Sequence, residues 1–586
     1  MRIGLLTDGG YPYATGESRL WCDRLVRGLA QHEFDLYALS RSAEQEAQGR
    51  VQLPPQIGRV RTAPLWTADE DAGSGHRIPK GLLARMMTGG GPRSYGRRER
   101  RLFAAHFTAL ATSICTAGVT GTADEAGADA AATAAADAQF TAGLYGLAEL
   151  AREHGGLSAA LRSEPAVRVL EAACRAPGTG RAVQAATVPD LLAFVAELDR
   201  VLRPLSLDWY DEEGLGAVDL CHAASGGVAA LPGLLAKRFF GVPLLVTEHG
   251  VQLRAHYLAA TGAPLGTPVR ALLAAFHGRL ASEVYRQADL ITPGNAHARR
   301  WQERCGADHD KLRTVYPGME AARFATLGES DGDCGPNTLV WVGRIEPSKD
   351  LIALLHAFAG VRRAEPEVRL RIIGAPAPGA EGATYLAHCR ALAAQLFPDE
   401  AADAHAVGDN PVTFEDIGGA EVADLADAYA AGGIVVLSSV VEGFPISLVE
   451  AMFCGRATVS TDVGAVVEVI GGTGLVVPPR NPRALADACI ALLRDPERRA
   501  RLGAAARARA LELFTVEQNL AAFRGIYLEL ISRSPVRREA EGAPRPFAMP
   551  PEARVPVGWT TPPPHTPSWA TEGVCAGVRG TAAGDG

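Results

Sequence analysis

Two glutamates close to residue 450 have a spacing and a setting that suit chemistry on a polyhydroxylated ligand. Glu442 lies in a loop after a short apolar run, and the following Gly443 permits unusual backbone angles. Glu450 follows after seven intervening residues, in a helix predicted to begin at Pro445. A carboxylate among apolar neighbours is costly unless something hydrogen-bonds it, and a sugar diol would do so. The alternative is an exposed loop glutamate and a helical glutamate paired with an arginine.

Two basic residues flank a loop between a predicted strand and a predicted helix in the C-terminal half. Arg344 and Lys349 can direct their charges to one anion. Arginine offers phosphate a planar fork, and lysine offers a point charge. Loops at the carboxyl ends of parallel strands are where α/β proteins bind ligands. The alternative is that both side chains are ordinary exposed residues.

A histidine ends a continuous apolar strand in the N-terminal half. His249 follows the run Leu-Leu-Val-Thr-Glu and precedes Gly250. α/β proteins present catalytic groups from this position. Taken by itself, a histidine at a strand end is more often a structural residue.

The chain opens with a strand, a glycine-bearing loop and a helix from about Ser18. This order predicts the start of a Rossmann-like domain, and Gly10 and Gly16 lie in the loop. The loop lacks the pattern G-x-G-x-x-G, so it carries no dinucleotide fingerprint.

Length and composition limit the classes of protein that fit. A chain of 586 residues is too long for one core, and 47% hydrophobic with 21% charged residues is typical of a soluble globular protein. The net charge of −8 argues against a nucleic-acid partner. The sequence enters a strand directly and has no apolar run of about 20 residues, so we expect neither a signal peptide nor a membrane span. Ten scattered cysteines without a C-x-x-C pair indicate a reduced, cytoplasmic protein without a zinc site.

Strands and helices alternate in both halves, which predicts two Rossmann-like, doubly wound α/β domains facing a cleft. Leu312–Tyr316 is predicted as the last strand of the first domain. The expected divisions are an N-terminal domain (1–325), a linker (326–337), a C-terminal domain (338–514), a further helix (515–533) and a disordered tail rich in proline, alanine and glycine (534–586).

A helical insertion interrupts the first domain at about residues 67–207. Within it, residues 117–138 contain too few apolar side chains to offset the entropy of ordering them, so a mobile loop is predicted. The insertion could serve as an acceptor-side lid or a docking surface, or be an expanded linker. Asp331 and Asp333 form a D-x-D in the linker, where we interpret them as turn residues rather than metal ligands.

These motifs together resemble the retaining nucleotide-sugar glycosyltransferases of family four, which have the GT-B fold. The resemblance implies that 1–325 is the acceptor-side domain, that 338–514 is the nucleotide-sugar-binding domain and that 515–533 is a crossover helix. Glu442 and Glu450, with G-F-P after the first, match the family's E-x7-E motif. The resemblance implies that Glu442 lies at the transferred sugar and that Glu450 holds the nucleotide ribose. It also places Gly443, Phe444 and Pro445 on the donor side.

The same resemblance assigns the remaining candidates. Arg344 and Lys349 match the family's phosphate-binding pair, and His249 matches a histidine that points into the interdomain cleft. Gly10 and Gly16 occupy the place of a loop close to the donor, although the family more usually has two adjacent glycines where this chain has Thr15-Gly16.

Three features look like the PelF-type subgroup, whose members act in exopolysaccharide synthesis with UDP-glucose: T-D-G-G-Y-P-Y, the long insertion and L-L-V-T-E-H-G. The resemblance implies hexosyl transfer from UDP-glucose with retention, without metal or cofactor, to a saccharide or lipid-linked acceptor. Such a protein would work in the cytoplasm or at the inner face of the membrane with a synthesis complex. The alternatives are a GDP-mannose or other hexosyltransferase, and a subunit that binds nucleotide sugars without catalysis.

Overall fold

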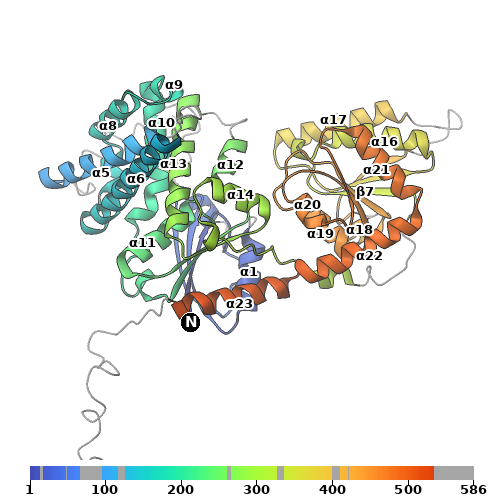
Figure 1. Ribbon diagram of the computed structural model, residues 1–586, viewed down its shortest axis with the longest axis horizontal. Helices are drawn as coiled ribbons and strands as arrows, with labels where there is room; N and C mark the ends of the chain where they lie inside the picture. The colour runs from blue at the N-terminus through green and yellow to red at the C-terminus, as the bar shows by residue number, and fades with distance from the viewer. Residues whose placement is uncertain are drawn as a thin grey trace, which may run out of the picture. The chain divides into compact units, whose positions relative to one another are not determined.

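The computed structural model describes residues 1–13, 18–47, 49–65, 95–116, 126–259, 265–325, 335–398, 410–419 and 422–533. Within these ranges the chain builds two six-stranded sheets whose paired strands are all parallel (Figure 1). In both sheets the strands are apolar runs that are followed by loops and helices, as the sequence predicts.

The first sheet has the order β3-β2-β1-β4-β5-β6, and the second has β12-β11-β10-β7-β8-β9. In both, the order reverses between the first and the fourth strand, as in Rossmann folds. The strands of the first sheet are β1 Arg2–Asp8, β2 Glu33–Ser40, β3 Ile57–Pro64, β4 Leu220–Ala223, β5 Leu244–Glu248 and β6 Leu290–Pro293. Those of the second are β7 Thr338–Val342, β8 Arg369–Ile373, β9 Val412–Glu415, β10 Ile434–Leu437, β11 Ala457–Thr461 and β12 Leu475–Val477.

Helices flank both sheets. Those around the first sheet are α1 Ser18–Gly28, α2 Ala43–Ala47, α11 Leu231–Phe240, α12 Gln252–Ala259, α13 Thr267–Gln287 and α14 Ala296–Arg304. The second domain has α16 Leu351–Ala364, α17 Ala380–Leu396, α18 Leu425–Ala430, α19 Ile446–Phe453, α20 Val466–Ile470, α21 Pro482–Leu493 and α22 Pro496–Leu513, and α23 Val516–Arg533 follows.

Alternate side chains of the central strands enter different cores, because successive residues of a strand point to opposite faces. In β1, Ile3 and Leu5 lie in one core and Leu6 in another. In β7, Trp341 and Val340 are divided in the same way. Both faces of each sheet are therefore covered, which explains the continuous apolar character of these strands.

The prediction of a strand at Leu312–Tyr316 is wrong, because this segment makes only an isolated bridge between Ile291 and Leu312. Two of its amides do reach β6: the Arg313 N–H donates to the carbonyl of Ile291 at 2.9 Å, and the Val315 N–H donates to the carbonyl of Pro293 at 3.0 Å. Pro293 has no N–H to return a bond, so the ladder cannot be extended there.

The insertion is a group of helices beside α13 (Figure 1). Its helices are α5 Arg97–Cys115, α6 Ala126–His154, α7 Leu157–Leu161, α8 Glu164–Cys174, α9 Arg181–Gln184 and α10 Val188–Leu202. Residues 117–125 lie outside the described residues, but the predicted mobile loop is wrong from Ala126 onward, where α6 begins. Alanine has the highest helix propensity, and the later turns of α6 bury Phe140 and Leu144.

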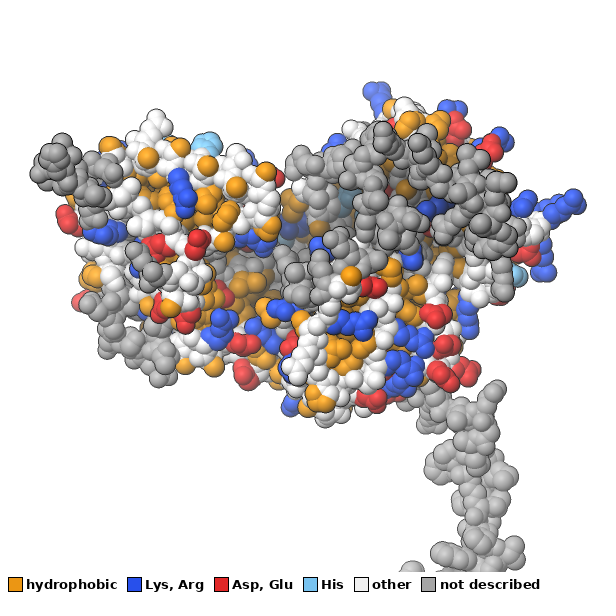
Figure 2. All heavy atoms as spheres, turned by 180° about the vertical axis from the view of Figure 1, so that it is seen from behind, with side chains coloured by type: hydrophobic (Ala, Val, Ile, Leu, Met, Phe, Trp, Pro, Cys, Tyr) orange, Lys and Arg blue, Asp and Glu red, His pale blue; other side chains and the backbone are white. Residues whose placement is uncertain are grey.

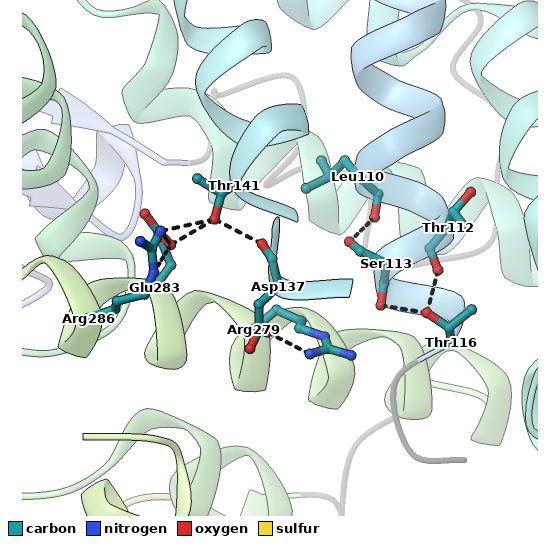
Figure 3. A network of polar contacts seen from close by, with 9 residues as sticks. All are labelled: Leu110, Thr112, Ser113, Thr116, Asp137, Thr141, Arg279, Glu283 and Arg286. Atoms are coloured by element: carbon teal, nitrogen blue, oxygen red, sulfur yellow. Dashed lines mark hydrogen bonds and ion pairs between the residues drawn. The ribbon is translucent and has the colours of Figure 1, made fainter. Parts of the chain in front are cut away.

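Polar contacts join α6 to α13 of the Rossmann core (Figure 3). The Thr141 hydroxyl donates to the buried carboxylate of Glu283 at 2.8 Å, and Arg279 pairs with Asp137 at 2.6 Å. Tyr145 also donates to Glu283, at 2.9 Å. The insertion is thus anchored by a carboxylate that has several donors, which offsets the cost of its burial.

The helix expected at 515–533 is α23, and it packs against the first sheet, although it follows the second domain in sequence (Figure 1). Phe523 and Tyr527 lie in the same core as Ile3 and Leu5. The Tyr527 hydroxyl is 2.7 Å from Nδ1 of His222, whose Nε2 is 2.7 Å from the Thr247 hydroxyl. The linker segment 326–334 and the tail 534–586 lie outside the described residues.

The described part of the chain contains no helix with the length and apolar character needed to cross a membrane. On the face drawn in Figure 2, lysine and arginine side chains lie among acidic and apolar ones. On that face, the described residues form no broad basic surface of the kind that nucleic acids require.

His222 should make the folded state sensitive to acid. Burial lowers its pKa from 6.5 to about 3, so the unfolded chain binds a proton at this site that the folded chain excludes. The resulting stability is complete above pH 6.5 and is lost as the pH falls toward 3. Between pH 7.5 and 5 the loss should be about 2 kcal/mol.

The measurement is urea unfolding at both pH values for the wild type and His222→Gln, which lacks the titrating ring. The variant should lose about 2 kcal/mol less than the wild type over this interval. His309→Gln is the control, because the His309 side chain is 73% exposed. Equal losses in the wild type and His222→Gln would contradict the prediction.

Candidate functional site

The loops after β7 and β10 lie side by side at the point where the strand order of the second sheet reverses. Lys349 ends a short 3-10 turn after β7, and its Nζ forms an ion pair with the carboxylate of Glu442 in the loop after β10. The Ser438 hydroxyl donates to the carbonyl of Lys349 at 2.7 Å, and the Val440 N–H donates to that of Ser348 at 2.9 Å. Two predicted site residues are therefore brought together by three separate contacts.

Glu442 is only 8% exposed and has a second donor, the Ser439 hydroxyl, at 2.8 Å. The backbone of Glu442 is also closely packed, against the loop after β11. A Cβ on Gly464 would lie 2.5 Å from the carbonyl oxygen of Glu442, and Gly464 itself has a φ of +58°. The next N–H, of Ala465, donates to the carbonyl of Gly443 at 3.1 Å. Only glycine at position 464 allows this approach of the loops after β10 and β11.

Arg344 lies at the start of the same β7 loop, and its side chain is 56% exposed. Its Nε is 4.0 Å from the carboxylate of Glu346, so the guanidinium remains close to the loop. The loop ends at Asp350, whose side chain accepts from the Ala353 N–H at 3.2 Å and caps α16. Arg344 and Lys349 thus flank the loop as predicted, with the Arg344 side chain 56% exposed and that of Lys349 20% exposed.

Glu450 lies in the second turn of α19 and accepts a hydrogen bond from the Tyr429 hydroxyl at 2.7 Å. Burial raises the pKa of the Glu450 carboxyl, while the Tyr429 hydroxyl and the charges of Arg323 and Arg24 oppose that rise. The alternative of a salt bridge to arginine therefore does not describe this residue. Its direct partner is a neutral hydroxyl on α18.

The segment Gly443 to Pro445 leads into α19. The Phe444 ring packs against Phe514, with ring centres 5.7 Å apart, and against Tyr316. Its side chain therefore belongs to the core, so the loop can offer a ligand its backbone at this position rather than the ring. Pro445 is the N-cap of α19, and Ile446, the first helical residue, is 56% exposed.

His249 follows the last residue of β5, and both of its ring nitrogens are buried without a hydrogen-bond partner among the described residues. The Trp21 ring meets it edge-on, with ring centres 5.3 Å apart. On another side is Gly294, where a Cβ would lie 2.4 Å from Nδ1. Burial lowers the pKa of His249 to about 4, so the ring is neutral at pH 7.

Glu248, beside His249 in sequence, is a fully buried carboxylate that sequence reasoning missed. It accepts hydrogen bonds from the Tyr285 hydroxyl on α13 and from Gln302 on α14 at 3.0 Å. The Gln252 N–H at the start of α12 donates at 3.4 Å. Burial raises the pKa of Glu248, and these donors oppose the rise. A polar residue at the end of an apolar strand was the available signal.

Other residues near the site were also not predicted from sequence. Arg254 on α12 donates to the backbone carbonyl of Glu442 at 3.0 Å. Glu468 on α20 accepts from the Tyr316 hydroxyl at 2.9 Å and from the Ala296 N–H at 2.7 Å. These contacts join residues more than a hundred positions apart, which spacing in the sequence does not reveal.

The residues predicted in the first glycine-bearing loop and in the linker lie close to or outside the limits of the described ranges. Gly10 is buried after β1, and its carbonyl accepts from the Tyr13 N–H at 2.8 Å. Gly16 lies outside the described residues, as do Asp331 and Asp333. Within the described ranges, no three histidine, cysteine or acidic side chains are grouped as a metal site would require.

Comparisons with known proteins identify family models and relatives that this chain matches. Residues 336–495 match the model of a family described as glycosyl transferases group 1. Residues 1–89 and 133–310 match a domain of unknown function (DUF3492). The first match covers the strands of the second sheet, and the second match covers those of the first sheet.

Among curated proteins, a D-inositol 3-phosphate glycosyltransferase of Xylanimonas cellulosilytica is 30% identical over 365 residues, covering 59% of this chain and 78% of that protein. One of Kineococcus radiotolerans is 31% identical over 255 residues, covering 40% of this chain and 56% of that protein. The chain therefore spans little more than half of some of these relatives.

Among solved structures, sucrose-phosphate synthase from Thermosynechococcus elongatus aligns with a TM-score of 0.50 and 17% identity, covering 91% of this chain and all of that one. At this identity the likeness concerns the fold. With two six-stranded Rossmann-like sheets, the chain has the two-domain GT-B architecture and belongs to the group 1 glycosyltransferase family.

Proposed function

We propose that the protein is a retaining, metal-independent glycosyltransferase that moves a hexosyl group from a nucleotide sugar, with UDP-glucose as the donor. The observation that supports this most is the pairing of Lys349 with Glu442 across the loops after β7 and β10. In open α/β sheets the reversal of strand order is where ligands bind, and these loops border it. Both residues come from motifs that match the family.

The chemistry follows from charge and position. The pyrophosphate would lie between Arg344, Lys349 and the N-terminus of α19, where positive charge and exposed N–H groups favour an anion. As the bond from the anomeric carbon to phosphate breaks, its electron pair passes to the phosphate oxygen. These groups stabilise the charge that develops there, which is catalysis by positioning and electrostatics.

The acceptor hydroxyl would attack the same face of the sugar that the phosphate leaves. The new carbon–oxygen bond forms as the old one breaks, and the acceptor proton passes to the leaving phosphate oxygen. His249, with two buried nitrogens and no partner among the described residues, is the group we assign to the sugar side. Glu442 lies at the transferred sugar and Glu450 at the ribose.

The acceptor and the pathway are proposed from resemblance. The PelF-like features favour a saccharide or lipid-linked acceptor in exopolysaccharide synthesis, with a membrane-associated complex as partner. The relatives named above are D-inositol 3-phosphate glycosyltransferases, so a phosphorylated cyclitol is the second acceptor class. GDP-mannose is the second donor.

The function is tested by thermal stability against UDP, GDP and their sugars, followed by turnover with the stabilising donor in EDTA. A ligand at a hundred times its Kd adds about 2.7 kcal/mol of stability. Stabilisation by UDP-glucose with turnover in EDTA supports the proposal. A preference for GDP-mannose would change the donor, and binding without transfer to any acceptor or water would favour a non-catalytic subunit.

Arg344→Ala should lower kcat/KM for the donor about ten- to a hundredfold, because a charged hydrogen bond to phosphate contributes roughly 1.5–3 kcal/mol. Lys349→Ala should lower it at least as far, since it also leaves the buried Glu442 carboxylate without its cation. Arg363→Ala, an exposed arginine on α16, is the control. Near-normal donor kinetics in both variants would remove the phosphate assignment.

His249→Ala should lower kcat by about a hundredfold or more while the Kd for UDP stays within a few fold, because we assign the ring to the sugar and not to the nucleotide. Calorimetry with UDP and single-turnover assays measure the two quantities. His256→Ala on α12 is the matched control, since Nε2 of His256 is 3.1 Å from the Arg270 carbonyl. Equal losses of UDP affinity and turnover would place His249 elsewhere.

Glu450 is tested by a cycle of wild type and Glu450→Ala against UDP and its 2′- and 3′-deoxy forms. In the wild type each missing hydroxyl should cost about 1–3 kcal/mol of binding, and in the variant that cost should vanish. Tyr429→Phe serves as the control, because the carboxylate that accepts the ribose is retained. A coupling energy of zero for both analogues would leave Glu450 as a structural residue bonded to Tyr429.

A further inference from the structure

The helical insertion holds two cysteines whose sulfur atoms are in contact. Cys115 is the last residue of α5 and Cys174 is the last residue of α8. Their Sγ atoms are 3.6 Å apart, and both side chains are buried, with 0% and 2% exposure. Neither cysteine takes part in the nucleotide-sugar chemistry proposed above.

We propose that Cys115 and Cys174 form a covalent modification site, an intramolecular disulfide that closes when the protein meets a disulfide oxidant such as oxidised glutathione. A disulfide has a sulfur–sulfur distance of about 2.05 Å, so the two atoms need to approach by roughly 1.6 Å. A movement of that size is within reach of side-chain rotation and small shifts at helix ends.

The position of both residues at helix ends favours closure. A residue in the last turn of a helix has a carbonyl without a partner in the helix, and helix ends open more readily than helix centres. The end of α5 is retained by the Thr116 hydroxyl, which donates to the Thr112 carbonyl at 2.9 Å (Figure 3). The Thr179 hydroxyl similarly donates to the Cys174 carbonyl at 2.9 Å. In the folded state these hydrogen bonds keep the two buried side chains facing each other. Local opening of the helix ends would give a disulfide oxidant access to them.

The two thiols are not equivalent. The contact between the two sulfur atoms lowers the pKa of Cys174 and raises that of Cys115, so Cys174 is the first nucleophile. Its thiolate attacks one sulfur of oxidised glutathione and releases one glutathione thiol. Cys115 then attacks the mixed disulfide and releases the second. Two thiol protons and two electrons pass from the protein to the oxidant, which becomes two molecules of reduced glutathione.

The disulfide would close the chain between Cys115 and Cys174 into a ring that contains α6, α7 and α8. Because a cross-link restricts the unfolded chain, the oxidised protein should unfold at a higher temperature than the reduced one. The alternative is that the two cysteines only fill space in the core of the insertion, as buried cysteines often do.

The experiment uses the full chain with Cys334→Ser and Cys575→Ser, which removes two cysteines outside the described residues. The protein is brought to equilibrium in glutathione buffers of increasing oxidised fraction, quenched, alkylated and digested. The expected product is one peptide pair joining Cys115 to Cys174, lighter by two hydrogen atoms than the reduced pair. It should appear in a single two-electron transition, with a rise in Tm that dithiothreitol reverses.

Cys115→Ser and Cys174→Ser should each abolish both the cross-linked peptide and the rise in Tm. Cys489→Ser is the matched control, because Cys489 is equally buried but lies on α21 of the second domain, and it should change neither. If a variant does not fold, the peptide map of the parent protein decides. Two free thiols at equilibrium in the most oxidising buffer, or a disulfide from either cysteine to another partner, would overturn the proposal.

Discussion

The ion pair of Lys349 and Glu442 is the contact on which the candidate site depends. The residues are 93 positions apart, and they meet only because β7 and β10 are neighbours in a sheet whose strand order reverses there. The pair removes two charges from water, and its geometry is secured by Ser439 on the carboxylate and Ser438 on the backbone. Such a pair is stable only with these additional hydrogen bonds, because the cost of desolvation otherwise exceeds the Coulombic gain.

The cost of burying a carboxylate is offset differently in the first domain. Glu248 is buried with neutral donors from α12, α13 and α14, so three helices converge on one carboxylate at the end of β5. The next residue, His249, has no such partners among the described residues. The strand end therefore combines a residue whose hydrogen bonds are satisfied within the protein with one whose hydrogen bonds are not. The first fixes the backbone, and the second is the residue that we propose meets the ligand.

Sequence patterns predicted most strands of both sheets, because parallel strands are continuous apolar runs. They also predicted that Lys349 and Glu442 lie in loops after such strands, where the structure brings them together. They failed where local composition and tertiary context disagree. Low apolar content predicted a loop where alanine propensity and packing on α13 give the helix α6. Pro293 has no N–H to donate, so Leu312–Tyr316 does not continue from its isolated bridge into a seventh strand of the first sheet. Contacts such as Tyr429 with Glu450 and Gly464 with Glu442 depend on the fold, so spacing alone could not predict them.

A remaining question is whether a bound pyrophosphate would separate Lys349 from Glu442, and the magnitudes give an answer. Breaking a buried ion pair costs about 3–5 kcal/mol, because it leaves one charge unpaired. A charged hydrogen bond to phosphate contributes roughly 1.5–3 kcal/mol, which is too little to offset that cost. The ammonium has three donors, and Glu442 engages one of them. The pair should therefore persist when the donor binds, with Glu442 holding the ammonium in place and the remaining N–H groups available to the phosphate. The ion pair that stabilises the loops would then also be what preorganises the lysine for its ligand.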